Sequence, residues 1–425
     1  MIGRALTLAE LLRNERRPRA ALLDEQFQRL RALVRHAGTN VPAYRDLWQQ
    51  HGVGPETLRT PQDLQRFPVV DKATMRRLGV AAFVDERLAS TSALVRCSTS
   101  GSSGMPFDFW FTPRHDQWRK AQYLRPYLST GRRLGDRTLR LSAFPATRPR
   151  WFERLGLLRE YRLDANLDAA EVVERWRELT PDVVQGYGSA LRAVALHALG
   201  RGLQLPAPRL VYTDSELLRA DTRRLLHQAF GTDPLDVFGT FETDNIAWQC
   251  EHRCAYHVAI DCAVVEVLDA RGAALDAGEG DLVVTVLGNE AMPFIRYNLR
   301  DRAAWISGEC ACGRTLPRLD VTRGRSDDLM LVAGERRSPM RVLEHFDAFG
   351  HAVLEYQLRQ VHPDEIEIHL VPGPGYDTAI GATLAGLVAR DCTPLRATLV
   401  LEERIARTAA GKFKAFESRL GVASA

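Results

Sequence analysis

A run of hydroxyl-bearing and glycine residues has a composition that suits phosphate binding. It consists of Ser98, Thr99, Ser100, Gly101, Ser102, Ser103 and Gly104, and Pro106 closes it. Glycines let the backbone approach a ligand, successive N–H groups form a nest for anions, and hydroxyls add donors. The run directly follows an apolar, strand-like segment that ends at Cys97, a rare place for a flexible linker, which is the alternative. We predict a phosphate-binding loop, but not a P-loop, because the Gly-Lys-Ser/Thr ending is missing.

Cysteine and histidine residues gather in two short segments that suit a metal ion. The first is Cys250-Glu-His-Arg-Cys254-Ala-Tyr-His257, and the second is Cys310-Ala-Cys312-Gly. Thiolates and imidazoles are the ligands of tetrahedral structural zinc, and a C-x-C pair before glycine favours a tight metal-binding turn. Unrelated surface cysteines are the alternative interpretation.

Lysine is scarce, so its positions carry information. The chain has 57 Lys and Arg residues, of which only four are lysines: Lys72, Lys120, Lys412 and Lys414. Two of the four stand close together near the C-terminus. A solvated tail of a chain that otherwise uses arginine would not be expected to concentrate lysine in this way.

Composition limits the classes of function. The chain has 425 residues, 45% hydrophobic content and a net charge of +4. No basic run with interleaved aromatic residues indicates nucleic-acid binding. No apolar run is long enough to span a membrane, and the N-terminus lacks the apolar core of a signal peptide. Seven cysteines are few for a secreted disulfide scaffold, so we expect a cytoplasmic protein with neither nucleic-acid nor membrane partners.

Apolar segments that precede polar turns and amphipathic stretches predict an α/β fold. Strand-like segments at Val183-Val184 and Leu210–Tyr212 precede predicted helices at 190–199 and 216–230. Ser189 and Ser215 are the predicted N-caps of these helices. Strand, turn and helix in repetition indicate a parallel sheet. Two further segments, 258–267 and 281–287, are predicted to be sequential strands around a Gly-rich turn.

The last hundred residues have a different pattern. Segments 355–359, 365–370 and 397–401 alternate like half-exposed strands, and an Ala/Leu-rich helix is predicted at 378–390. At 425 residues the chain exceeds the size at which single cores usually split. We therefore predict a large domain over 1–325, with mixed sheets and helices, and a small α+β domain over 326–425.

Four further motifs complete a family pattern. They are Asp236-Val-Phe-Gly-Thr-Phe-Glu242, Pro293-Phe-Ile-Arg-Tyr-Asn-Leu-Arg-Asp301, Arg323-Gly-Arg-Ser-Asp-Asp328 and Arg407-Thr-Ala-Ala-Gly-Lys412-Phe-Lys414. With the Ser/Gly run, their order and spacing resemble those of the phenylacetate–CoA ligase-like branch of the adenylate-forming superfamily. The resemblance extends from about residue 25 to residue 416. It implies an adenylate-forming large domain and a mobile C-terminal lid.

The resemblance also implies roles for individual residues. The Ser/Gly run would hold the β- and γ-phosphates of ATP. Glu242 would bind Mg²⁺, Thr240 would lie near the α-phosphate, and Asp301 would accept both ribose hydroxyls. The remaining implied nucleotide-site residues are Ser215, Glu216, Phe238, Gly239 and Arg325, with Asp327 as the hinge between the domains. Two departures stand out: no lysine flanks Pro106, and Arg300 replaces the family's usual glycine before Asp301.

Three groups of residues complete the implied site. Lys412 would stabilise the meeting of carboxylate and phosphate, with Lys414 in reserve. By the family pattern the zinc ligands would be Cys250, His257, Cys310 and Cys312, although Cys254 or His252 could replace one of them. The predicted walls of the acid pocket are Tyr187, Gly188 and Tyr212, whose aromatic rings point to an aryl or arylalkyl acid.

The sequence therefore predicts an ATP-dependent enzyme that converts a carboxylic acid to acyl-AMP and passes the acyl group to an acceptor. Coenzyme A is the expected acceptor. An adenylating enzyme that uses an amine or a carrier protein is one alternative. A non-catalytic nucleotide-binding protein on the same fold is another, supported only by the missing loop lysine and by Arg300.

Overall fold

The computed structural model describes residues 2–89, 93–99, 107–143, 148–321, 324, 329–350, 352–408 and 412–420. The chain divides into two compact units. The first unit comprises residues 1–131 and 237–321, and the second comprises residues 132–236 and 322–425. Both units are therefore built from segments that lie far apart in the sequence.

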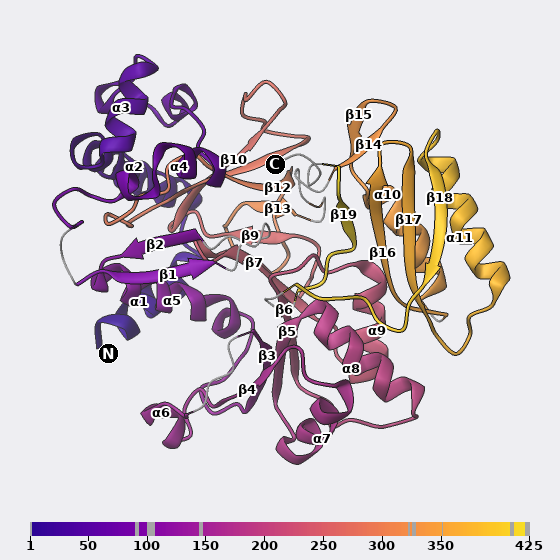
Figure 1. Ribbon diagram of the computed structural model, residues 1–425. Coiled ribbons are helices and arrows are strands. Elements are labelled where there is room, and N and C mark those ends of the chain that lie inside the picture. Colours follow the sequence, from indigo (N-terminus) through magenta and orange to yellow (C-terminus); the bar gives the residue numbers. More distant parts are fainter. Residues whose placement is uncertain are drawn as a thin grey trace. The chain divides into compact units, whose positions relative to one another are not determined.

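The first unit begins with helices. The helices are α1 (Ile2–Asn14), α2 (Arg19–Asn40), α3 (Pro42–Gln50), α4 (Lys72–Leu78) and α5 (Pro113–Ser129) (Figure 1). On α2, Leu30, Leu33, Val34 and Ala37 are buried, so one face of the helix is apolar. Pro42 begins α3, where a proline without an N–H group costs no helical hydrogen bond.

The strands of the first unit form an antiparallel array. Along it the order is β10 (Ala263–Leu268), β11 (Glu279–Val286), β12 (Tyr297–Ile306), β13 (Arg318–Asp320), β9 (Tyr256–Val258), β8 (Asp244–Gln249) and β7 (Leu235–Thr240). The pairing of β10 with β11 confirms two sequential strands, but the first begins at Ala263 and not at residue 258, because residues 259–262 form a turn after β9. A separate antiparallel pair, β1 (Val95–Thr99) and β2 (Phe107–Phe111), flanks the Ser/Gly run.

The second unit contains the predicted parallel sheet. Its strands follow the order β6 (Leu210–Asp214), β5 (Val183–Tyr187), β3 (Thr138–Ser142) and β4 (Glu160–Asp164). The associated helices are α6 (Trp151–Arg154), α7 (Ala169–Leu179), α8 (Gly188–Gly200) and α9 (Ala220–Phe230) (Figure 1). Leu141, Val172, Trp176, Val184 and Leu191 belong to the core that the sheet and helices share. Strand and helix order therefore agree with the predicted α/β pattern.

Both predicted N-caps of this unit are wrong. Ser189 is the second residue of α8, and Tyr187 takes the cap position. The Ser189 N–H and hydroxyl instead both donate to Glu216. Ser215 lies in the turn before α9, which begins later than expected, at Ala220 after Arg219.

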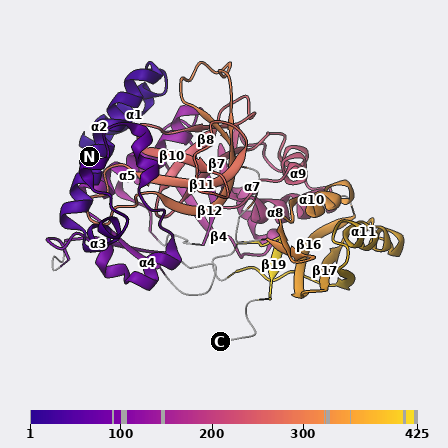
Figure 2. The same cartoon turned by 90° about the horizontal axis from the view of Figure 1, so that it is seen from above.

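The C-terminal α+β domain also lies in the second unit. A four-stranded sheet has the order β18 (Arg396–Leu401), β17 (Glu365–Pro372), β16 (Val353–His362) and β19 (Phe416–Ser418). Helix α11 (Thr378–Asp391) packs on it, and Leu384 and Val388 contribute to the shared core. Figure 2 shows α11 beside α10 (Met340–Leu343), β16 and β17. A small hairpin of β14 (Met330–Val332) and β15 (Glu335–Arg337) precedes them.

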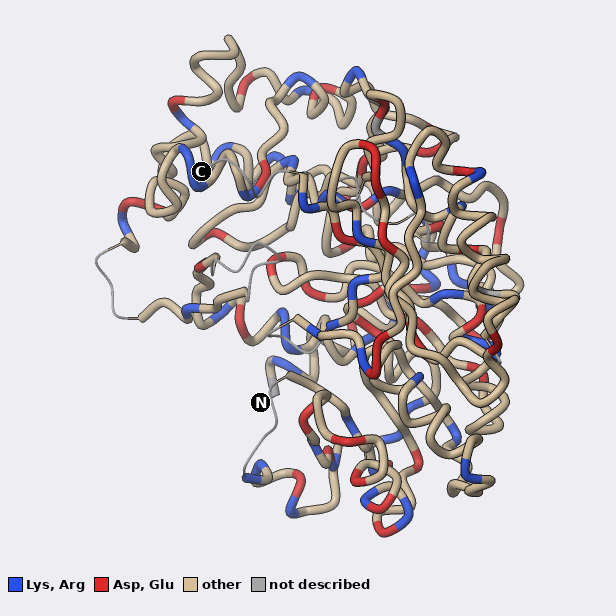
Figure 3. The backbone as a smooth tube through the Cα atoms, turned by 45° about the vertical axis from the view of Figure 1, so that its right-hand side comes forward, with Lys and Arg blue, Asp and Glu red and all other residues tan. Residues whose placement is uncertain are grey.

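The predicted fold class is confirmed: the protein is mixed α/β, with large sheets and a smaller α+β C-terminal domain. Within the described residues, none of the helices is both long and apolar enough to cross a membrane. Acidic and basic positions are interspersed along the chain (Figure 3). The domain boundary at residue 325 and the mobility of the lid stay predictions.

Candidate active site and cysteine–histidine centre

The turn between β7 and β8 in the first unit presents Glu242. Its side chain is 3% exposed, and Lys72 Nζ lies 2.7 Å from its carboxylate. The hydroxyl of Tyr297 lies 3.5 Å from the same carboxylate oxygen. Burial and the charge of Glu242 raise the pKa of Tyr297, so this phenol remains a hydrogen-bond donor. Glu242 is thus a buried carboxylate whose charge an ammonium group compensates.

Local backbone contacts fix this turn. Gly239 lies at a bulge between β7 and β8, and a Cβ there would lie 2.0 Å from the carbonyl oxygen of Asp244. Only glycine fits such a close approach. The hydroxyls of Thr240 and Thr243 lie 3.1 Å apart, and the Thr240 N–H donates to Thr243. The predicted motif residues Gly239 and Thr240 therefore shape the turn that carries Glu242.

The segment before α4 brings Lys72 to Glu242. Val70 bridges to β12, because its N–H donates to the Arg296 carbonyl and its own carbonyl accepts from Asn298 N–H. Asp71 caps α4 by accepting a 2.7 Å hydrogen bond from Thr74 N–H. Burial raises the pKa of Asp71, but hydrogen bonds from Thr74 and Arg300 outweigh this effect and the net pKa is lowered. Lys72, the first residue of α4, therefore follows a segment bound to β12 and begins a helix that Asp71 caps.

Strand β12 carries the predicted ribose ligand. Asp301 lies half-buried in this strand. The residue before it, Arg300, has a φ of 63°, the left-handed region that favours glycine. The position where the family usually has glycine therefore keeps a glycine-like backbone, while the Arg300 side chain forms an ion pair with Asp71.

The predicted phosphate loop is described only at its start. Ser98 and Thr99 end β1, opposite Asp108 and Phe107 of β2. The Thr99 hydroxyl is buried and has no hydrogen-bond partner among the described residues. Ser100, Gly101, Ser102, Ser103 and Gly104 lie outside the described residues.

The first unit brings the four chosen metal ligands together. Cys250, His257, Cys310 and Cys312 are buried, and their ligand atoms all lie within 4.8 Å of one another. The thiols of Cys250 and Cys310 are 3.6 Å apart, and Cys312 Sγ lies 3.3 Å from His257 Nε2. Burial and the charge of Arg314 lower the pKa of His257 to about 4, so its imidazole is neutral. Neutral imidazole and thiol groups in this arrangement suit a metal ion.

Register explains how these four residues meet. His257 on β9 pairs with Arg318 on β13, and the turn before β13 carries Cys310 and Cys312. Cys250 directly follows β8, the neighbour of β9 on its other side. Cys254, one of the two alternative metal ligands, is exposed and does not belong to this cluster.

The second unit presents Glu216 at the ends of parallel strands. It follows β6, and its carboxylate accepts from Ser189 at the start of α8, which follows β5: Ser189 N–H donates at 2.8 Å and its hydroxyl at 2.9 Å. Burial raises the pKa of Glu216, although the donated hydrogen bonds and the charge of Arg407 oppose this. The predicted pocket residue Tyr212 is buried in β6, and Ser215 is exposed beside Glu216.

The lysine predicted to be catalytic lies at the same strand ends. Lys412 Nζ is 5.9 Å from the centroid of the Tyr187 ring. Lys412 N–H donates to the Thr408 hydroxyl, and Thr408 N–H donates to the Lys412 carbonyl, so two hydrogen bonds join these residues. Phe413 N–H donates to Glu216 at 2.7 Å. The C-terminal motif is therefore bound to the turn after β6.

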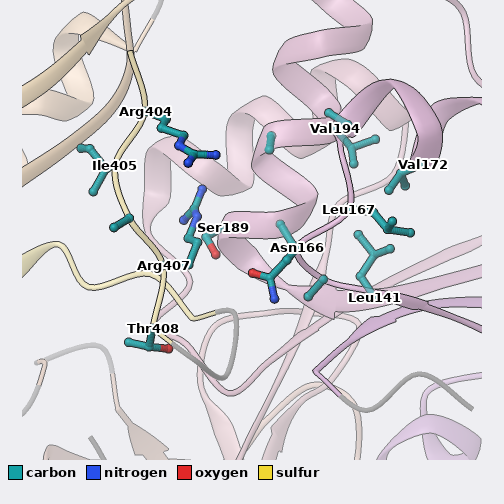
Figure 4. Close-up of a pocket in the computed structure, with 15 residues that line it drawn as sticks. Leu141, Asn166, Leu167, Val172, Ser189, Val194, Arg404, Ile405, Arg407 and Thr408 are labelled. Atoms are coloured by element: carbon teal, nitrogen blue, oxygen red, sulfur yellow. The ribbon is translucent and has the colours of Figure 1, made fainter. Parts of the chain in front are cut away.

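A cavity of about 500 Å³ lies next to this motif (Figure 4). One wall is apolar and includes Leu141, Val172 and Val194, and the C-terminal segment adds Arg404 and Arg407. Ser189 lines it as well as contacting Glu216. The predicted pocket residues Tyr187, Gly188 and Tyr212 are not among its lining residues, although Ser189 and Ala190 directly follow the first two.

Comparison with known proteins adds relatives to this geometry. No protein-family model matches the chain. The phenylacetate–coenzyme A ligase of Pseudomonas putida is 26% identical over 374 residues, which cover 82% of this chain and 82% of that protein. The protein of the same name from Escherichia coli K12 is 26% identical over 375 residues, covering 81% of this chain and 80% of the relative. The predicted resemblance to phenylacetate–CoA ligases is confirmed.

Solved structures of similar fold agree. A 2-hydroxyisobutyryl-CoA ligase in the postadenylation state aligns over 96% of this chain and 92% of its own, with a TM-score of 0.80 and 21% identity. The same ligase in the thioesterification state aligns over 97% and 93%, with a TM-score of 0.65. The chain therefore has the fold of these CoA ligase structures.

The structure places the predicted site residues unevenly. Phe238, Gly239 and Thr240 lie at the end of β7, and Glu242 lies in the turn that follows. Glu216 and Lys412 lie near each other in the second unit, because Glu216 binds the N–H of Phe413. Arg325 and Asp327 lie outside the described residues. Sequence analysis missed Lys72 and Tyr297 as contacts of Glu242. One signal was available, because Lys72 is one of only four lysines.

Proposed function

We propose that this phenylacetate–CoA ligase-like protein uses ATP to convert a carboxylic acid into acyl-AMP, releasing pyrophosphate, and then transfers the acyl group to coenzyme A. The observation that carries the proposal is the position of Lys412. Its ammonium lies over Tyr187, at the carboxyl ends of parallel strands β5 and β6. Ligands of α/β proteins bind at such strand ends. The names of the relatives and the acyl-AMP and CoA complexes of the structural neighbours agree with this chemistry.

We assign the first half-reaction to the motif residues. A carboxylate oxygen attacks the α-phosphorus of ATP and pyrophosphate leaves, so negative charge concentrates around the reacting groups. The ammonium of Lys412 would stabilise this charge. Asp301 would accept the ribose hydroxyls, Phe238 would pack on adenine, and the Ser98–Gly104 loop would hold the outer phosphates. Asp327 would serve as the hinge of a lid formed by residues 326–425.

Mg²⁺ is part of the proposal, and Glu242 is its proposed ligand. A buried carboxylate needs a compensating cation, and the ammonium of Lys72 already provides one at 2.7 Å. The site therefore suits positive charge next to Glu242. When bound, Mg²⁺ would neutralise phosphate oxygens of ATP.

We further propose that Cys250, His257, Cys310 and Cys312 bind a structural zinc ion. A Zn–S bond of about 2.3 Å in tetrahedral geometry places two sulfurs about 3.8 Å apart, close to the 3.6 Å between Cys250 and Cys310. Purified protein should contain about one zinc per chain, and Cys310→Ser should lose it together with thermal stability. The matched control is Cys254→Ser, because Cys254 is exposed outside the cluster.

Pyrophosphate release measured across a panel of carboxylic acids tests the main proposal. The aromatic Tyr187 and Tyr212 favour aryl and arylalkyl acids, which should give the highest rates. Thioester formation with free coenzyme A should follow. Turnover only with a carrier protein or an amine would favour the alternative acceptors. ATP binding without pyrophosphate release for any acid would favour the non-catalytic alternative. A cytoplasmic location is proposed with the enzyme, on the basis of its few cysteines.

A further inference from the structure

The backbone directly after Lys412 is bound by a side chain from another part of the second unit. Phe413 N–H donates a 2.7 Å hydrogen bond to Glu216 Oε1. Glu216 belongs to the turn that follows β6 of the parallel sheet. Other contacts of this C-terminal segment lead to its own domain: Gln357 donates to the Lys414 carbonyl, and Leu358 N–H to the Ala415 carbonyl. Glu216 therefore links the Lys412 segment to the parallel sheet.

The donors around Glu216 require both of its carboxylate oxygens to accept hydrogen bonds. Oε1 accepts from the Ser189 hydroxyl and from Phe413 N–H, and Oε2 accepts from Ser189 N–H. An ionised carboxylate is acceptor-only and meets all three donors. Glutamine has the same shape, but its NH₂ group would face either the Ser189 N–H or the other two donors. The ionised form of Glu216 thus orients three donors, and the charge of nearby Arg407 favours this form.

Other links between the parallel sheet and the C-terminal domain lie elsewhere in the sequence. Arg192 donates to the Leu354 carbonyl, and Arg219 donates to the Leu343 carbonyl. These contacts can hold the domain, but they involve residues distant in sequence from Lys412. The hydrogen bond at Phe413 is one residue from the lysine, so it holds the backbone from which the Lys412 side chain extends.

We propose that Glu216 is a positioning residue for the first half-reaction: by accepting the Phe413 N–H, it holds Lys412 over the strand ends where the carboxylic acid is adenylated. This rests on the proposed function and on the role of Lys412. Because Glu216 acts through Lys412, it matters for acyl-AMP formation and much less for transfer from acyl-AMP to coenzyme A. Any withdrawal of the Lys412 segment from the parallel sheet would break this hydrogen bond.

The test measures the two half-reactions separately. Glu216→Gln should lower acid-dependent ATP–pyrophosphate exchange about 10- to 100-fold, the range expected for losing a hydrogen bond to a charged group. Thioester formation from supplied acyl-AMP and coenzyme A should fall less than about threefold. Equal losses in both half-reactions, or no loss in exchange, would overturn the proposal.

A second pair of variants tests the donor. Phe413→Ala and Phe413→Pro both remove the ring, but only proline removes the N–H. Exchange should fall about tenfold further in Phe413→Pro than in Phe413→Ala, and combining Phe413→Pro with Glu216→Gln should add little. Additive losses would contradict the shared hydrogen bond. Failure of the proposed function is distinguishable, because the wild-type protein would then show no exchange with any acid.

Discussion

Glu242 and Glu216 are carboxylates that the chain holds in different ways. In the first unit, an ammonium lies 2.7 Å from Glu242. In the second unit, Glu216 has no ion pair with lysine or arginine among the described residues and accepts from two N–H groups and a hydroxyl. A carboxylate compensated by one cation can exchange it for another, whereas one bound by backbone donors fixes the position of the chain. The first arrangement suits metal binding and the second suits orientation.

The two lysines differ in a corresponding way. Lys72 begins a helix that Asp71 caps, and its ammonium is engaged by Glu242. Lys412 Nζ lies 5.9 Å from the centroid of the Tyr187 ring, at the ends of parallel strands. Lys72 is thus a compensating charge for Glu242, whereas the chemical role that we propose for Lys412 rests on its position at these strand ends.

The largest effect is expected from Lys412→Ala. Loss of the ammonium should lower acid-dependent ATP–pyrophosphate exchange by about 10²- to 10³-fold, the usual effect of removing one group that stabilises transition-state charge. Lys414→Ala is the matched control, since it removes the neighbouring lysine, and it should stay within about threefold of wild type. Exchange that survives Lys412→Ala unchanged would contradict the assignment.

Glu242→Gln should have the next largest effect. It keeps the shape of the side chain and removes the charge, so the Mg²⁺ concentration for half-maximal exchange should rise at least about tenfold. Glu216→Gln is the informative control, because the comparison predicts slower exchange with an unchanged Mg²⁺ requirement. If both variants shifted the Mg²⁺ dependence equally, the distinction between the two carboxylates would fail.

Much of this fold follows from the sequence because periodicity and strand–turn–helix order are local properties. Strands β5, β6, β10, β11, β16 and β17 and helix α11 lie where the residue pattern predicts them. The helix starts after β5 and β6 were less predictable. Ser189 looked like a cap, but its N–H and hydroxyl are used by Glu216, which is distant in the sequence. A tertiary contact thus overrode a local preference.

The candidate site was predictable to the same limited extent. The four cysteine and histidine residues could be chosen from spacing and family pattern, and register then brought them within 4.8 Å. The contact between Lys72 and Glu242 could not be predicted in this way. It depends on a bridge between Val70 and β12 that no sequence motif indicates. Likewise, no local pattern indicates that Glu216 binds the backbone at Phe413.

Lys72→Met should lower the stability of the folded protein and not only its activity. It leaves Glu242 buried beside an apolar side chain, and we expect a loss of about 1–3 kcal/mol in the free energy of unfolding, reduced because Lys72 is 38% exposed. Thermal melting with and without Mg²⁺ is the measurement. Added Mg²⁺ should stabilise Lys72→Met more than wild type if Glu242 accepts the ion. Lys414→Met, as control, should melt like wild type.

The smallest effect concerns a buried histidine in the first unit, His115. Burial and the charges of Arg119 and Arg29 lower its pKa to about 3. The unfolded chain binds a proton near pH 6.5 and the folded protein does not, so stability is present above that pH and is lost as pH falls. Between pH 7 and pH 5.5 the free energy of unfolding should drop by about 1 kcal/mol from this residue.

Denaturant unfolding of His115→Gln at both pH values tests this loss. The variant removes the titrating imidazole, so the difference between its unfolding free energies at pH 7 and pH 5.5 should be about 1 kcal/mol smaller than in wild type. The same pH dependence in His115→Gln as in wild type would mean that other titratable groups govern acid sensitivity.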